Sequence, residues 1–112
     1  MTENLVDLDP KVLKAVLKQG GKKQVDSLLE LFKKNAPMRV KELEAAPDLD
    51  EAQAAAKALG RSAKNLGLMA LTAACDDIAA LNKWSTGTPL AKVPGALLAK
   101  GIAALTKLRL TL

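Results

Sequence analysis

The chain has 112 residues, of which 49% are hydrophobic and only 2% aromatic, with 17 basic residues, 12 acidic residues and no histidine. This length suits one domain over residues 1–112, and the apolar share is large enough for a core. The lack of histidine removes the commonest general base and metal ligand, and the scarcity of aromatic rings leaves no stacking platform for single-stranded nucleic acid. The net charge of +5 favours an anionic partner, which can be nucleic acid, a membrane surface or an acidic pocket of a protein.

Nothing in the sequence predicts export or insertion into a membrane. Cys75 is the only cysteine, so no disulfide can form within the chain, and a lone thiol suits a reducing compartment. The segment from Met1 to Asn4 lacks the basic and apolar regions of a signal peptide. No apolar run approaches the roughly 20 residues of a membrane-spanning helix. We therefore expect a cytoplasmic protein.

Two helices are predicted in the first half of the chain. Asp9 as N-cap and Pro10 as the first helical residue begin a short helix, which ends at the glycine pair 20–21. A longer helix is expected over residues 22–46, because apolar residues recur there at steps of three and four. Pro37 should kink this helix or remove one of its hydrogen bonds. Its apolar face consists of Val25, Leu28, Leu29, Phe32, Ala36, Val40 and Leu43.

Three helices are predicted in the second half. Asp50 should cap a helix over residues 51–66, and the next helix, over 68–83, is followed by Trp84, which we expect to cover one end of the fold. The last helix begins at Thr88-Pro89 or only at Pro94. The apolar positions are Ala52, Ala55, Ala56, Leu59, Ala63 and Leu66, then Leu71, Ala74, Cys75, Ile78 and Leu81, then Leu90, Val93, Leu97, Leu98, Ile102, Leu105, Leu108 and Leu112. Amphipathic helices joined by short loops predict an all-α fold, an antiparallel four-helix bundle with a short extra N-terminal helix.

The third predicted helix carries the motif by which the chain resembles a known family. Residues 55–67, AAKALGRSAKNLG, are similar to the signature helix of histidine phosphotransfer (HPt) domains, in which Ala-His, any residue and Leu-Lys-Gly-Ser are followed by Leu-Gly. The resemblance continues in order and spacing over residues 8–10, 28–32, 36–37 and 43–46, and reaches Leu71 and Cys75 in the fourth helix. It implies an HPt-like fold and a place in bacterial two-component signalling.

The departures from this family fall on its chemistry. Lys57 stands where the phospho-accepting histidine is expected, and the Lys-Gly pair of the motif is reversed as Gly60-Arg61. A solvated lysine amine is protonated near neutral pH and is a poor nucleophile. The resemblance therefore implies a monomeric, non-enzymatic module without cofactor or small-molecule substrate, which docks a response-regulator receiver domain or a histidine kinase without transferring phosphate.

The same helix predicts where such a partner binds. On a helical wheel, Lys57, Arg61 and Lys64 form a stripe opposite the apolar residues, with Gly60 and Gln53 beside it. The resemblance implies that receivers dock on this face with a pocket of carboxylates, which the ammonium and guanidinium groups would pair with. A glycine beside them would admit a partner's backbone. A run of charge on a helix is also what an ordinary solvated face looks like, and this interpretation stays open.

A second class of function remains open as an alternative. A basic helical bundle can bind an anionic surface, either nucleic acid or a membrane, and the final predicted helix is amphipathic with Lys100, Lys107 and Arg109. The bundle needs that apolar face for its core, so we expect neither nucleic acid nor membrane to be the main partner. No metal site is predicted, because Asp76 and Asp77 are adjacent and splay about 100° apart on a helix.

Overall fold

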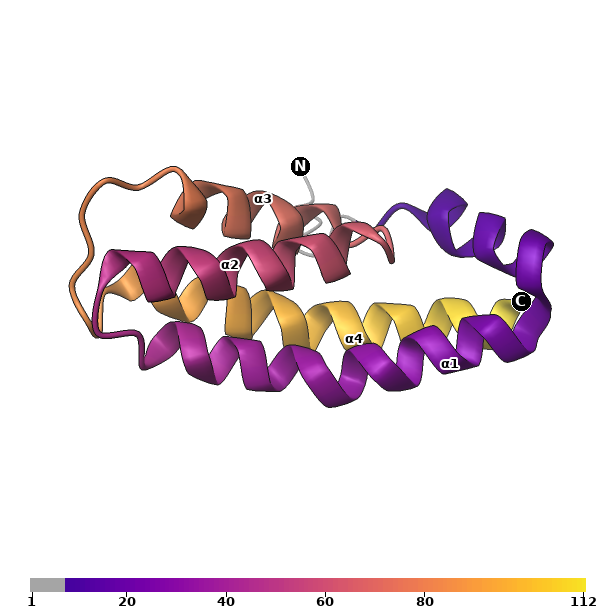
Figure 1. Cartoon of the computed structure of the whole chain (residues 1–112). Helices are drawn as coiled ribbons and strands as arrows, with labels where there is room; N and C mark the ends of the chain where they lie inside the picture. Colours follow the sequence, from indigo (N-terminus) through magenta and orange to yellow (C-terminus); the bar gives the residue numbers. More distant parts are fainter. Residues whose placement is uncertain (1–7) are drawn as a thin grey trace, which may run out of the picture.

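The computed structural model describes residues 8–112 and folds them into helices (Figure 1). The elements are α1 (Pro10–Glu44), α2 (Leu49–Lys64), α3 (Met69–Ala79), the 3₁₀ turn η1 (Pro89–Lys92) and α4 (Val93–Thr111). Residues 8–112 contain no strand, and their β-type pairing is an isolated bridge between Leu8 and Leu68. The all-α prediction is confirmed for this part of the chain.

Two helical stretches make up α1, and they meet at Gly21. This residue has φ 74° and ψ −178°, which lies in a region that glycine adopts without the steric cost of a side chain. The chain turns sharply there, so residues 10–20 stand at one end of the molecule, away from the rest of α1 (Figure 1). The predicted break at the glycine pair is confirmed. Pro37, by contrast, lies inside continuous helix, where it withdraws one backbone hydrogen bond without interrupting the helical dihedrals.

Aspartates cap both long N-terminal helices. The Asp9 carboxylate accepts a hydrogen bond from the Lys11 amide at 3.0 Å, as the sequence predicts. The cap of α2 is Asp48, whose carboxylate accepts from the Glu51 amide at 2.9 Å. The prediction that Asp50 caps this helix is wrong, because the helix already begins at residue 49. Asp50 lies in the first turn instead, where a negative charge suits the positive end of the helix dipole.

The helix predicted over residues 68–83 is α3, which is shorter than predicted and ends at Ala79. The Gln53 side chain satisfies two backbone carbonyls at this helix end, since its amide nitrogen donates to the carbonyls of Ala79 at 2.9 Å and Leu81 at 2.8 Å. Farther along, the Trp84 indole donates to the carbonyl of Ala46 at 2.9 Å and packs against the core. The indole therefore ties the segment after α3 to the connection between α1 and α2, which is the covering role expected for it.

One hydrophobic core lies between the four helices. Contacts join α1 to α2 and α4, and α3 to α2 and α4, so the helices lie side by side (Figure 1). The apolar residues predicted for α2 are all buried: Ala52, Ala55, Ala56, Leu59, Ala63 and Leu66. Leu90 and Val93 are exceptions in the last helix, because they are 43% and 42% exposed while Pro94 is buried. Residues 89–92 form a 3₁₀ turn of about three residues per turn, so the α-helical period does not extend through them.

The apolar face of α4 belongs to this core. Leu98 and Leu105 are buried, and Ile102 packs against the same cluster. The face is therefore not free to lie on a membrane. Across the described part of the chain, no helix is both long enough and apolar enough to span a bilayer.

Candidate functional site

The three predicted basic residues stand on the solvent side of α2. Lys57, Arg61 and Lys64 are exposed, whereas Ala56 and Leu59 beside them in sequence are fully buried. This follows from the helical period, which places positions 57, 61 and 64 opposite the buried alanines and leucine. None of the three cations takes part in an ion pair within residues 8–112. We call these three residues the basic stripe.

Gly60 does not border the basic stripe at the surface. It is buried between α2 and α3, and a Cβ placed on it would lie 3.1 Å from the Cβ of Cys75. The missing side chain lets α3 approach α2 closely, so it serves the packing of the bundle. The prediction that this glycine admits a partner's backbone is wrong.

Gln53 is also directed into the bundle. Its side chain is half-buried, and its amide nitrogen is engaged by the two carbonyls at the end of α3. Like Gly60, it lies on the flank of α2 that faces α3. The sequence-predicted set therefore divides into three exposed cations and two residues that join α2 to α3.

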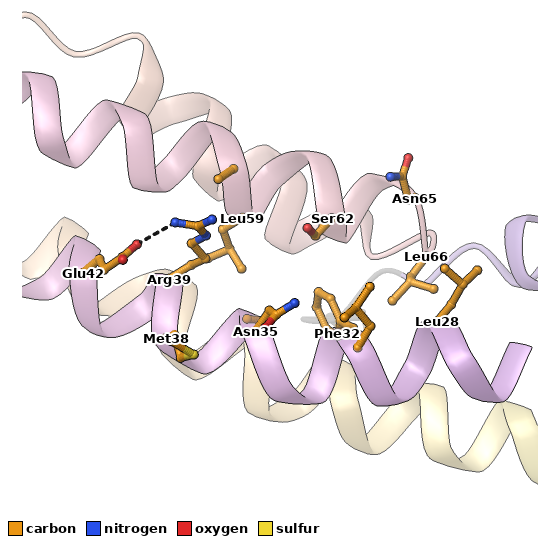
Figure 2. Close-up of a pocket in the computed structure, with 13 residues that line it drawn as sticks. Leu28, Phe32, Asn35, Met38, Arg39, Glu42, Leu59, Ser62, Asn65 and Leu66 are labelled. Atoms are coloured by element: carbon orange, nitrogen blue, oxygen red, sulfur yellow. Dashed lines mark hydrogen bonds and ion pairs between the residues drawn. The ribbon is translucent and has the colours of Figure 1, made fainter.

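A groove beside the basic stripe was not predicted. It lies between α1 and α2 and has a volume of about 400 Å³ (Figure 2). Phe32, Leu59 and Leu66 form its apolar floor. Leu31 and Met38 line it from α1, with 56% and 58% of their surface exposed. The feature of the sequence that could have indicated the groove is this pair of large apolar residues, which lie seven positions apart and outside the buried face of the helix.

Polar side chains line the groove from both helices. Asn35 projects from α1, and Ser62 and Asn65 belong to α2 and the residue after it (Figure 2). Amide and hydroxyl groups offer both donors and acceptors to a partner. Toward one end, Arg39 and Glu42 form an exposed ion pair at 3.0 Å. Such a pair contributes only about 0.2–1 kcal/mol and can exchange partners at low cost.

The remaining chemically distinctive group, the Cys75 thiol, is sequestered. Only 1% of the residue is exposed, and burial, reinforced by the charge of Asp76, raises the pKa of the thiol to about 12. The thiol therefore stays protonated near neutral pH, as expected for a structural cysteine. Within residues 8–112 no cluster of three or more acidic, cysteine or histidine side chains is placed to hold a metal ion.

Comparison of the chain with protein-family models, with curated proteins and with solved structures gives no match. The features of the chain that bear on function are the resemblance of residues 55–67 and the geometry of α1 and α2. That geometry comprises a row of cations without ion-pair partners among residues 8–112 and, on the adjoining side of the same helix, a partly apolar groove.

Proposed function

We propose that this chain is a protein-interaction module of two-component signalling, which docks a receiver domain or a histidine kinase through α2 without transferring phosphate. We also propose that its four helices form an antiparallel, HPt-like bundle. The observation that carries the proposal is the exposure of Lys57, Arg61 and Lys64 on one side of α2. Lys57 occupies the position that the resemblance gives to the phospho-accepting histidine.

Charge complementarity supports a receiver as the partner. The resemblance implies a pocket of clustered carboxylates, and an ammonium group enters such a pocket as a compact point charge. Arg61 offers a planar guanidinium that can hold a carboxylate through two hydrogen bonds. Because the basic stripe has no ion-pair partner within the described residues, docking breaks no existing pair.

The groove supplies the apolar part of the same docking face. Ala58 and Ser62 line it, and each follows a residue of the basic stripe, Lys57 or Arg61, by one position. Successive residues of a helix lie about 100° apart around its axis, so the two features occupy adjoining sides of α2. A partner that spans α1 and α2 would contact both. Protein–protein interfaces commonly combine apolar contacts of this kind with direct hydrogen bonds and charged contacts.

The absence of histidine from all 112 residues supports binding without phosphotransfer. Incubation with a phosphorylated receiver carrying labelled phosphate should leave no label on this chain. Label that is stable to base and labile to acid, as a phosphoramidate is, would contradict the proposal.

The binding test is titration calorimetry against receiver domains of the source cell. Lys57→Glu should weaken binding about 30-fold or more, since loss of a buried charge pair costs about 2–5 kcal/mol. Arg61→Glu should weaken it less and Lys64→Glu least, because charges at the rim act mainly on the association rate. Lys83→Glu, at an exposed position outside α2, is the matched control and should leave binding intact. Binding that survives Lys57→Glu would leave only a solvated basic face.

A further inference from the structure

A second, separate cluster of positive charge lies at the start of α1. Residues 10–25 contain five lysines and no acidic residue, and all five lysines are exposed. The rest of the chain contains twelve basic and twelve acidic residues, so this stretch accounts for the whole net charge of +5. We call the set the lysine face: Lys11, Lys14, Lys18, Lys22 and Lys23.

Two acids flank the lysine face within the described residues, Asp9 and Asp26, and both already have hydrogen-bond partners. The carboxylate of Asp9 accepts from the backbone amide of Lys11 as the helix cap. The carboxylate of Asp26 accepts hydrogen bonds from both Nε and Nη2 of Arg109 on α4. No ion pair within residues 8–112 involves a lysine of this set. Within residues 8–112, therefore, no ion pair takes up the positive charge of this set.

The apolar side of this helical stretch is turned into the bundle. Leu13 is fully buried, and Val16 and Leu17 pack against the core. No large apolar side chain of residues 10–30 is strongly exposed, as the first such residue in the described chain is Leu31. A helix that binds a membrane surface needs exposed Trp, Phe or Leu to enter the headgroup boundary. The lysine face lacks such anchors, so its chemistry favours an anion that stays in water.

We infer that the lysine face binds the phosphodiester backbone of double-stranded nucleic acid without reading its sequence. Lys11, Lys14 and Lys18 follow one side of the helix over about 10 Å, at about 1.5 Å per residue. A duplex carries about one negative charge per 1.7 Å of its axis, so more than one phosphate lies within reach. Contacts from lysine to phosphate position a protein but carry no sequence information. The site shares no residue with the basic stripe and is independent of receiver docking.

The salt dependence of binding tests this inference. Anisotropy of a labelled duplex of about 20 base pairs is measured while salt rises fourfold, from about 25 to about 100 mM. The slope of log affinity against log salt is about −0.9 per phosphate contact, so the three contacts of Lys11, Lys14 and Lys18 predict a loss of affinity of about 40-fold, which rises to about 500-fold when Lys22 and Lys23 also contact phosphates. The full chain with Lys11→Gln, Lys14→Gln and Lys18→Gln retains at most two contacts and should lose no more than about 12-fold. A duplex of unrelated sequence should bind equally well.

The matched control carries Lys83→Gln, Lys92→Gln and Lys100→Gln, which remove the same charge from exposed positions elsewhere. It should keep the wild-type slope, and circular dichroism should show unchanged helicity in both triple variants. The inference is overturned by absence of duplex binding at about 25 mM salt, or by equal slopes for the two triple variants. A clear preference for one duplex sequence overturns it too. So does tighter binding to phosphatidylserine-containing vesicles than to the duplex, because a membrane would then be the partner.

Discussion

Enlarging Gly60 tests directly whether this residue belongs to the packing of α2 against α3 or to an open surface. In Gly60→Ala, the new Cβ would lie 3.1 Å from the Cβ of Cys75, which is tighter than ordinary contact. Replacing a helical glycine by alanine gains about 0.8–1.0 kcal/mol in helix propensity. Overpacking of a core costs about 1–3 kcal/mol. The free energy of unfolding should therefore stay level or fall by up to about 2 kcal/mol.

Gly60→Leu extends the same test. Three further carbon atoms follow a Cβ that already touches α3, so the helices must separate, and we expect a loss of at least about 2 kcal/mol. That loss lowers the melting temperature by about 8 °C in a chain of this size. Urea unfolding monitored by circular dichroism measures it. Ala54→Leu, at an exposed position of the same helix, is the control and should change stability by no more than about 0.5 kcal/mol. If Gly60→Leu unfolds at the wild-type urea concentration, this glycine faces solvent and the assigned packing is incorrect.

Three further predictions concern other groups. The Cys75 thiol should resist alkylation in the native protein and react in urea. Because folding raises the pKa of this thiol from 9.0 to about 12, the wild-type protein should lose stability relative to Cys75→Ala as the pH rises from 9 toward 12. The hydrogen bond from Arg109 lowers the pKa of Asp26 below 3.8, so this pair stabilises the fold above that pH and its contribution is lost in acid. In Arg109→Gln, the free energy of unfolding should therefore decline less steeply below about pH 4 than in the wild-type protein. An identical decline in both proteins would contradict the pairing. The double variant Leu31→Ser with Met38→Ser should weaken receiver binding at least about 10-fold, since truncating a central interface residue costs more than about 1 kcal/mol. Its melting temperature should stay within about 2 °C of the wild-type value, because both side chains are exposed. Unchanged binding would exclude the groove from the docking face.

The helices and most of the core could be predicted from the sequence because their signals are local. The period of apolar residues in α2 identifies its buried side, and the glycine at position 21 identifies the break in α1. Both depend on backbone geometry within a few residues. The shift of the cap from Asp50 to Asp48 is a small failure of the same kind, because two aspartates two residues apart offer the backbone equivalent acceptors.

For residues on the flanks of α2, the sequence alone could not show which ones face a neighbouring helix and which ones face solvent. A helical wheel separates buried from exposed positions, but it does not say which flank a neighbouring helix covers. Only the packing of α3 shows that Gly60 and Gln53 face inward, while Lys57 remains in solvent. The groove needs residues from two helices that are more than twenty positions apart, such as Phe32 and Leu59. Similarly, composition gives the net charge, but it does not show whether the charged residues are exposed. Which side of residues 10–20 carries exposed lysines depends on which side the bundle buries. Local periodicity thus determined each helix, and the long-range contacts between helices decided which of its surfaces a partner can reach.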